Sequence, residues 1–557
     1  MGSNLLERPY GGAGGSQHYP CRRVRVRAPH ADPPKSLRKR SVTDEFVIRL
    51  RFYFLFSVIN PLSLSKKFTF GLIWNIIGKT MMGIFGAIIS ILIARKLGKT
   101  ELGLYASILT IPTTLRPFTS LGFETILNVK LPVLNTLEDS IKKMRFLIRK
   151  LFLYRIVIIF ATAVLLYFAM PLLQGFFKNV SLPQYIILII FYLGALMIFS
   201  YVTMIFRALL RIKLVSIIEG ISQLINLLLL ILFFAMGFKI AAVLSAFIIS
   251  SLLTTFILIF LGKDYIFGDT SPMKLNESYE IGAAAVLGAF IAFGLGTQAD
   301  IIIMNYFNVP SEEIGFYFLC FSLASMMMLL LQGIGALSQS VFSEQYSKKG
   351  NSGLALSWSM VTQVSILLSI PIYIFAIFNA KTIIEILYGG QFSAVAVYFK
   401  IFASFGCITT LGGAAFCMPV FYLLRRKKLA LKIQLAGGIL NIVLNIILIP
   451  KYGVWGVVLA TGFSRALGGV IQMLFVRYYI NAEFPLIFEL KLLFACLIAL
   501  IPTVLVEGSD IIAFLLKMIV YGFGLVALLF LLKPLSEKAK AFVESTDKRI
   551  FAFVRFF

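Results

Sequence analysis

The sequence contains a series of continuous apolar runs of about 20 residues, which constrain its fold more than any other feature. A helix of that length crosses the hydrocarbon core of a bilayer, which is about 30 Å thick. With 59% hydrophobic and 14% charged residues, the chain has too little charge for a soluble globular surface, which needs about 25%. Because the runs are continuous and do not alternate with polar residues, they exclude an outer-membrane barrel. The sequence therefore predicts an all-α polytopic membrane protein.

The apolar runs predict fourteen transmembrane helices. We expect them near residues 70–94, 103–127, 151–173, 184–206, 214–236, 241–262, 281–303, 314–342, 357–379, 397–422, 429–449, 455–476, 491–506 and 511–532. Lysine and arginine gather in alternate loops, above all at 142–150 and 425–428. Because cytoplasmic loops carry an excess of these residues, both termini are predicted to be cytoplasmic. The protein is thus expected in the cell membrane (the cytoplasmic or inner membrane) as a multi-pass protein.

Two halves of the chain are related by an internal repeat. Residues 206–260 align with 421–476 at an offset of 215 positions. The aligned segments share two basic residues and an asparagine, which are Arg211, Lys213 and Asn226 in the first and Arg426, Lys428 and Asn441 in the second. The pattern Glu-(Leu/Ile)-Gly-(Leu/Phe)-Tyr also occurs at 101–105 and again at 313–317. Two halves with an even number of spans have the same orientation in the membrane, which is typical of transporters.

The repeat and the composition divide the chain into seven predicted segments. They are a disordered basic leader (1–45), an interfacial segment (46–65), an N-terminal six-helix bundle (66–262), a cytoplasmic linker (263–280), a C-terminal six-helix bundle (281–477), an extra helix pair (478–532) and a cytoplasmic amphipathic tail (533–557). The leader holds both histidines and no apolar run, so it is not a signal peptide.

The sequence offers little for enzymatic or metal chemistry. The cysteines form no CxxC pair, and two Gly-Lys-Thr triplets lack the glycine of a phosphate loop, because Ile73 and Ile93 stand there. No predicted loop exceeds about 25 residues, so a glycosyltransferase or polymerase with a large outward loop is not expected. We therefore expect no enzyme, no cofactor, no metal site and no nucleic-acid partner. Transport would use an ion gradient, the membrane potential or the substrate's own gradient.

Charge inside a membrane span is costly and usually faces a cavity or a partner, and we single out three cationic side chains in the predicted spans. Arg116 lies near the centre of the second span, between two prolines that each remove a helix hydrogen bond. Lys79 lies in the first span and Arg465 in the twelfth. We predict that these three residues bind an anionic substrate, which the net charge of +27 also suits. The alternative for each is snorkelling or a structural ion pair.

Among the acidic side chains, Glu124 and Asp300 lie inside predicted spans, whereas Glu219 and Glu344 lie within two turns of the predicted cytoplasmic face. We predict that Glu124 and Asp300 bind a coupling cation, either H+ or Na+. They are also the natural partners for Arg116 if that residue forms a structural ion pair.

Four stretches, at 97–105, 300–317, 387–392 and 428–456, resemble a known family. The last is the most specific, with Asn441-Ile-Val-Leu-Asn445 followed by Ile-Pro-Lys-Tyr-Gly453. Over roughly residues 66–532 the chain is similar to the polysaccharide biosynthesis flippases of the Wzx type, in the multidrug/oligosaccharidyl-lipid/polysaccharide exporter superfamily. The resemblance implies two six-helix bundles and a C-terminal helix pair around a central cavity. Many relatives carry Asp where this chain has Ser120, so no role is transferred to that position.

The resemblance implies a flippase that moves a polyprenyl-(pyro)phosphate-linked oligosaccharide from the cytoplasmic to the outer leaflet by alternating access. Its partners would be the lipid-linked glycan, membrane lipids and the glycan polymerase or transferase machinery. Two alternatives share the fold. A peptidoglycan lipid II flippase would differ only in the sugar that it accepts, whereas a multidrug or cation antiporter would need an acidic cavity.

The charge asymmetry of the loops gives a test of topology. A cysteine placed in the 380–392 loop should react with a membrane-impermeant thiol reagent added from outside, and a cysteine at 425–428 should not, because the basic cluster is predicted to be cytoplasmic. The reverse labelling pattern would overturn the predicted orientation.

Overall fold

The computed structural model of the protein describes residues 64–135, 141–273, 275–483, 485–508 and 510–533. Within these ranges the chain is helical and contains no strand, so the all-α prediction is confirmed. The predicted leader and nearly all of the interfacial segment and the tail lie outside the described residues.

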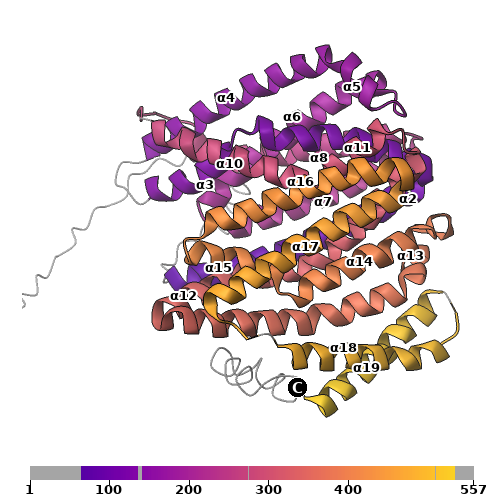
Figure 1. The fold of residues 1–557 in the computed structure, drawn as a ribbon. Helices are drawn as coiled ribbons and strands as arrows, with labels where there is room; N and C mark the ends of the chain where they lie inside the picture. Colours follow the sequence, from indigo (N-terminus) through magenta and orange to yellow (C-terminus); the bar gives the residue numbers. More distant parts are fainter. Residues whose placement is uncertain (1–63, 136–140, 274, 484, 509, 534–557) are drawn as a thin grey trace, which may run out of the picture. The chain divides into compact units, whose positions relative to one another are not determined.

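The N-terminal half is a group of long helices joined by short turns (Figure 1). Its elements are α2 (Leu64–Thr119), α3 (Phe123–Leu134), α4 (Ile141–Phe168), α5 (Met170–Phe176), η1 (Leu182–Tyr185), α6 (Ile186–Ala208), α7 (Ile212–Ala235), α8 (Ile240–Leu261) and α9 (Lys263–Ile266). Helix α8 packs against α6 and α7, and α6 also packs against α3 and α4. The fully buried Tyr201 and Phe206 of α6 contribute to an apolar cluster shared with α3 and α4.

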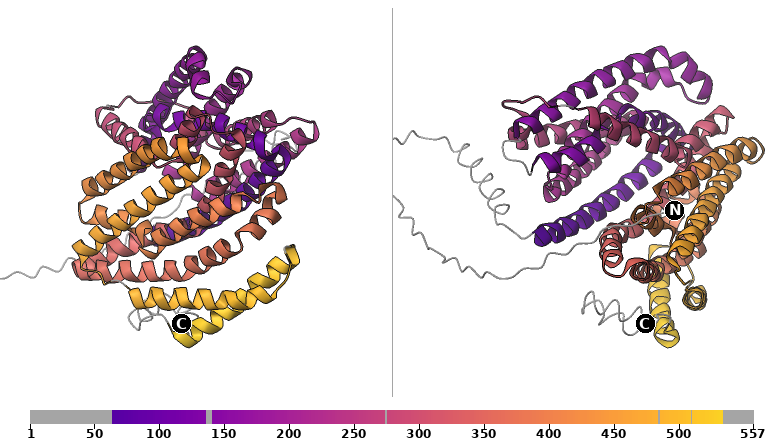
Figure 2. Two further views of the ribbon diagram at one scale, coloured as in Figure 1. Left: turned by 45° about the vertical axis from the view of Figure 1, so that its right-hand side comes forward. Right: turned by 60° about the vertical axis from the view of Figure 1, so that its left-hand side comes forward.

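The C-terminal half repeats this organisation and adds a helix pair. Its elements are α10 (Asn276–Gly294), α11 (Thr297–Tyr306), α12 (Ser311–Phe378), α13 (Ala380–Tyr388), η2 (Gly390–Phe392), α14 (Val395–Leu411), η3 (Ala414–Phe416), α15 (Cys417–Leu423), α16 (Lys427–Tyr452), α17 (Val454–Ile480), α18 (Leu486–Leu500), η4 (Ile501–Leu505) and α19 (Ile511–Leu532). Helix α14 packs between α12 and α17, and α16 packs against α17. The pair α18 and α19, coloured yellow in Figure 2, lies at the edge of this half beside α12 and α13.

The number of membrane spans depends on how broken helices are counted. Among the described residues, ten helices are long and apolar enough to cross a bilayer, or up to twelve if each bent pair is one span. Two of the ten, Thr80–Thr119 and Ser338–Phe378, contain a glycine with a positive φ, Gly98 at 75° and Gly350 at 60°. The predicted total of fourteen remains a prediction.

The chain reverses direction near Gly350. A Cβ placed on Gly353 would lie 2.5 Å from the carbonyl oxygen of Gln345. In a straight helix two residues eight positions apart are separated by about 12 Å, so the backbone must fold back between them. If α12 counts as two spans, the chain must turn back between them, as it does here.

Three membrane helices are interrupted within their length. α10 and α11 meet at a bend of 55°, and so do α14 and the segment that ends in α15. The third break follows α2, which runs through both of its prolines and ends only at Thr119, before Leu121 and Gly122 adopt positive φ. The prolines therefore do not break the helix themselves, and the chain instead breaks a few residues after Arg116.

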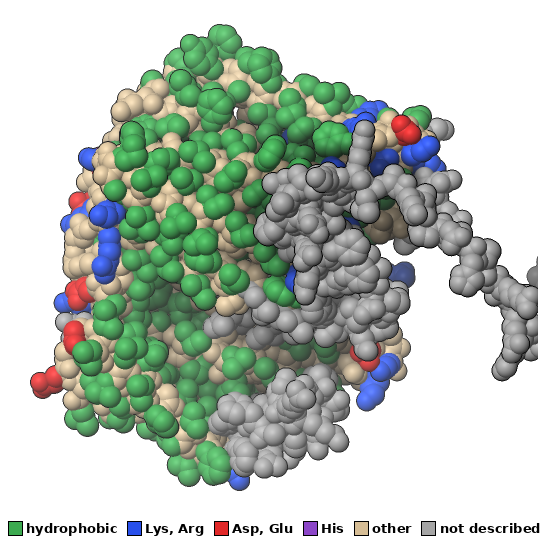
Figure 3. Space-filling model, turned by 180° about the vertical axis from the view of Figure 1, so that it is seen from behind, with side chains coloured by type: hydrophobic (Ala, Val, Ile, Leu, Met, Phe, Trp, Pro, Cys, Tyr) green, Lys and Arg blue, Asp and Glu red, His purple; other side chains and the backbone are tan. Residues whose placement is uncertain are grey.

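The surface of the described residues fits a bilayer. Figure 3 shows hydrophobic side chains over the middle of one face, with charged side chains gathered at its edges. Large apolar side chains such as Phe160 (71% exposed) and Phe523 (77% exposed) point away from the core. Because water would penalise so much exposed apolar area, this is the surface of a multi-pass membrane protein.

Candidate functional site

Arg116 lies in the last turn of α2. It is eighteen residues after Gly98 and eighteen before Leu134, where α3 ends. Its side chain is exposed, and among the described residues its guanidinium forms no ion pair. Arg116 therefore lacks a counter-ion among the described residues.

The other two predicted substrate residues are not brought to Arg116 by any described contact. Lys79 lies in α2, but its side chain is outside those described. Arg465 of α17 donates a hydrogen bond to the carbonyl of Leu295, at the break between α10 and α11. Its guanidinium also lies 4.7 Å from the ring centroid of Phe321. Arg465 is thus held within the C-terminal half, and its predicted role in substrate binding remains a prediction.

Glu124 forms an ion pair with a residue that the sequence analysis did not single out. Its carboxylate lies 2.7 Å from a guanidinium nitrogen of Arg155, whose side chain is fully buried. Ser200 donates a hydrogen bond of 3.0 Å to the same carboxylate oxygen. These contacts tie α3, α4 and α6 together. The geometry therefore gives Glu124 a structural role, and its predicted binding of a coupling cation remains a prediction.

Arg155 could have been found from its position. It follows the basic segment 142–150 so closely that it looks like part of the cytoplasmic rim, yet it lies inside the predicted span 151–173. In the structure the rings of Phe123 and Tyr201 each lie 5.4 Å from its guanidinium. Aromatic faces favour a buried cation, which helps to offset the loss of water.

Asp300 of α11 is fully buried and is the centre of a polar cluster formed by four helices. Amide groups of Asn441 and Asn445 on α16 donate hydrogen bonds of 2.9 and 2.7 Å to one carboxylate oxygen. The hydroxyl of Thr461 on α17 donates to the other oxygen at 3.1 Å, and the Tyr317 hydroxyl of α12 donates to it as well. Asp300 therefore has donors on both oxygens and no ion-pair partner within 4 Å among the described residues.

The amide oxygens of this cluster have no hydrogen-bond donor. Oδ1 of Asn441 and Oδ1 of Asn445 are both buried without a partner among the described residues. A half-turn of each amide exchanges its oxygen and nitrogen, and would direct both oxygens towards Asp300. Carboxylate, amide and hydroxyl oxygens are the ligands that hard cations prefer. The described residues contain no cluster of three or more His, Cys, Asp or Glu side chains.

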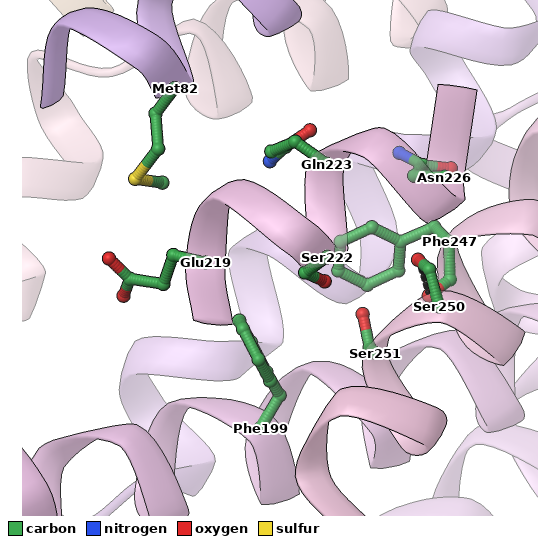
Figure 4. A pocket seen from close by; sticks show the side chains of 9 residues that line it. All are labelled: Met82, Phe199, Glu219, Ser222, Gln223, Asn226, Phe247, Ser250 and Ser251. Atoms are coloured by element: carbon green, nitrogen blue, oxygen red, sulfur yellow. Dashed lines mark hydrogen bonds between the residues drawn. The ribbon is translucent and has the colours of Figure 1, made fainter. Parts of the chain in front are cut away.

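The N-terminal half has a polar pocket in the corresponding region. Figure 4 shows this cavity of about 30 Å³, lined by Glu219, Gln223 and Asn226 of α7 and by Ser250 and Ser251 of α8, together with Met82, Phe199, Ser222 and Phe247. Asn226 is the repeat counterpart of Asn441. A cavity of this size holds about one water molecule. The carboxylate of Glu219 in this pocket is already bound, because Arg207 donates hydrogen bonds of 2.6 and 2.7 Å to its two oxygens.

Comparisons with known proteins agree with these observations. A sequence model of the family described as "Polysaccharide biosynthesis protein" matches residues 92–397, more than half of the chain. The uncharacterized membrane protein MJ1068 of Methanocaldococcus jannaschii is 21% identical over 214 residues. That match covers 38% of this chain and 42% of the archaeal protein, so less than two thirds of the relative is represented.

Solved transporters have the same fold. The inward closed conformation of the lipid II flippase MurJ matches with a TM-score of 0.64 at 19% identity, over 82% of this chain and 98% of MurJ. An inward-facing multidrug resistance MATE family transporter of the MOP superfamily matches with a TM-score of 0.57 at 12% identity, over 74% and 98% of the two chains. An outward-facing one gives 0.51 at 13%, over 74% and 95%. These likenesses confirm the predicted fold class.

The pair formed by Glu124 and Arg155 predicts a large effect on stability. Glu124→Ala leaves a buried guanidinium without its counter-ion, which costs about 3–5 kcal/mol, so the melting temperature of the purified protein should fall strongly. The double variant Glu124→Ala/Arg155→Met should recover part of the loss, because no buried charge remains.

A matched control is the exposed pair of Glu344 and Lys348, whose side chains are 60% and 63% exposed. Glu344→Ala should change stability by less than about 1 kcal/mol. Equal melting temperatures for Glu124→Ala and Glu344→Ala would contradict a structural role for the buried pair.

Proposed function

Because the chain belongs to the polysaccharide biosynthesis protein family, we propose that it is a flippase for a polyprenyl-(pyro)phosphate-linked oligosaccharide. It moves the glycan headgroup from the cytoplasmic to the outer leaflet of the cell membrane by alternating access, for the synthesis of a surface polysaccharide or glycan. The end of the molecule that carries the basic clusters faces the cytoplasm. The observation that carries this proposal is the exposed guanidinium of Arg116 in the last turn of α2, midway in the sequence between Gly98 and the end of α3.

A cation inside a membrane span needs an anionic partner, because the bilayer provides no water to solvate it. Two other arginines inside predicted spans, Arg155 and Arg465, are engaged within their own halves. Arg116 is the one whose partner is not found among the described side chains. The planar guanidinium binds two phosphate oxygens at once, so the (pyro)phosphate of a lipid carrier is a fitting ligand.

The segment after Arg116 offers polar groups to a sugar. Thr125 and Asn128 of α3 are exposed, and residues three apart lie on the same face of a helix. Their hydroxyl and amide groups both donate and accept hydrogen bonds, as sugar hydroxyls do. A phosphate at Arg116 would thus be followed, towards the cytoplasm, by a surface suited to the glycan.

The acidic residues argue against an organic cation as the substrate. A cavity for organic cations needs a free carboxylate, but Glu124 is paired with Arg155 and Asp300 is enclosed by four donors. A lipid II flippase shares the phosphate chemistry and the fold, and differs from our proposal only in the sugar.

We further propose that Asp300 holds the coupling cation, H+ or Na+. The unpartnered amide oxygens of Asn441 and Asn445 support this role, because they become ligands when the amides turn. Cation binding would affect α11, which carries Asp300, and α16, which carries Asn441. It would also reach the end of α10, since Asn441 donates a hydrogen bond of 3.0 Å to the carbonyl of Gly294.

The first test concerns Arg116. Arg116→Ala should abolish transport without lowering the amount of protein in the membrane, and Arg116→Lys should retain part of it, because the charge survives but the two-pronged contact does not. A charge-assisted contact contributes about 1.5–3 kcal/mol, or roughly ten- to a hundredfold in affinity. The measurement is glycan export in cells that depend on this protein.

Lys178→Ala, which removes an exposed cation from the loop after α5, serves as the control and should export normally. Full export by a well-expressed Arg116→Ala variant would refute the phosphate-binding role.

The second test concerns the coupling cation. If Na+ binds at Asp300, NaCl should raise the melting temperature of the purified protein more than choline chloride does. At a Na+ concentration of a hundred times the Kd, binding adds about 2.7 kcal/mol to the free energy of unfolding. Asp300→Asn keeps the shape of the side chain but should lose the salt-specific effect. The wild type and Asp300→Asn should therefore respond differently to Na+ or to pH. If their melting temperatures shift equally with both, Asp300 has only a structural role.

A further inference from the structure

The Glu-x-Gly-x-Tyr pattern occurs once in each half, and the two copies contact each other in the structure. A Cβ on Gly103 of α2 would lie 1.6 Å from the carbonyl oxygen of Ser311 and 3.1 Å from the nitrogen of Gly315, in α12. A Cβ on Gly315 would in turn lie 2.9 Å from the carbonyl oxygen of Lys99 and 3.1 Å from the nitrogen of Gly103. The two glycines occupy equivalent positions in the repeat, so the backbones of the two halves touch where only glycine fits.

The glutamate of each pattern binds within its own half. Glu101 accepts a hydrogen bond of 2.9 Å from Lys239, the residue just before α8, and this contact raises the pKa of the Lys239 ammonium group. Glu313 accepts a hydrogen bond of 3.2 Å from the backbone nitrogen of Val454, the first residue of α17. Val454 is the counterpart of Lys239 at the repeat offset of 215. Each pattern is therefore anchored to the last helix of its own bundle. It touches the other bundle through its glycine and through an aromatic residue, since the ring centroids of Tyr105 and Phe318 lie 5.9 Å apart and the Lys99 ammonium lies 5.8 Å from the ring centroid of Phe316.

Polar contacts between the halves surround the glycine pair. The ammonium of Lys99 lies 2.9 Å from the carboxylate of Glu312, and both side chains are about two fifths exposed, at 37% and 41%. Arg95 donates hydrogen bonds to the carbonyls of Leu387 and Ile386 in α13, at 2.9 and 2.5 Å. Asn179 donates one of 2.9 Å to the carbonyl of Val309. All of these residues belong to turns or helix ends opposite the basic clusters, at the end that our proposal places outside.

We propose that the contact between Gly103 and Gly315 is the closure of the transport pathway at its outer end, and that the two bundles separate there when the substrate is released. The inference rests on the proposed alternating access but not on the identity of the substrate. Because each glutamate holds its segment to its own bundle, the two patterns move apart with the bundles and do not need to unfold.

The chemistry of the contact suits repeated opening. An ion pair as exposed as Lys99 and Glu312 contributes little, so breaking this pair costs little when the outer ends separate. The close approach itself depends on the absence of a side chain, since one methyl group at position 103 would overlap the Ser311 carbonyl. A single methyl group should therefore hold the outer end open while the interior of each bundle stays intact.

The experiment compares Gly103→Ala with Gly86→Ala in the full-length protein. Gly86 lies in the same helix and has no atom within 4 Å of an added Cβ, so it is a matched control. Spin labels at Lys178→Cys and Lys381→Cys, in a background without the native cysteines, report the distance between the outer ends of the two halves. We expect Gly103→Ala to shift the distance distribution towards longer distances and Gly86→Ala to leave it unchanged. Identical distributions for Gly103→Ala and the wild type would overturn the proposal.

A second measurement covers the case in which Gly103→Ala does not fold. The pair Lys99→Cys/Glu312→Cys is treated with a short bis-methanethiosulfonate reagent, which joins the two thiols through disulfides. We expect cross-linking to stop glycan export and reduction to restore it. Full export by completely cross-linked protein would refute the closure.

The spin-label distances require no substrate, so they also separate this inference from the proposed function. An open outer end in Gly103→Ala together with full export by Arg116→Ala would retain the closure and reject the phosphate site.

Discussion

The structure depends on one constraint, which is that a charged or polar group inside a bilayer must find its partner within the protein. Arg155 is fully buried, and Glu124 neutralises it from a neighbouring helix. Arg465 satisfies a backbone carbonyl where α10 gives way to α11. Asp300 accepts hydrogen bonds from three other helices. Each of these contacts joins helices of the same half, so we expect each half to behave as a rigid body.

Contacts between the halves are more varied. They include close backbone approaches at glycines, such as Gly103 with Gly315, and polar contacts such as Lys99 with Glu312. Glycine contacts bring helices close without interlocking side chains. One apolar cluster also contains residues of both halves, such as Ile108 and Ile314. Arg116 belongs to a helix of the N-terminal half, but it has no ion-pair partner in that half among the described residues.

The internal repeat has kept the framework and changed the chemistry. Asn226 and Asn441 are equivalent, and each lines a polar region of its own bundle. In the N-terminal half the carboxylate there is Glu219, which Arg207 binds. In the C-terminal half it is Asp300, while the position equivalent to Asp300 in the first half is Ile88, at the offset of 212 seen for the Glu-x-Gly-x-Tyr pattern. The two halves therefore share a shape, but among the described residues only the second presents a buried carboxylate with unpartnered amide oxygens beside it.

The sequence by itself determined the helical class, the approximate spans, the repeat and the unusual position of Arg116. These follow from local composition, because the bilayer requires about 20 apolar residues per span and makes every internal charge conspicuous. Only the tertiary structure decided that Glu124 pairs with Arg155, that Asn441, Asn445 and Thr461 surround Asp300, and that α2 continues through its prolines. These three partners of Asp300 lie 141 to 161 positions away in the chain, whereas its fourth partner, Tyr317, lies 17 positions away. Residues so far apart meet only through the packing of helices, which hydropathy does not encode.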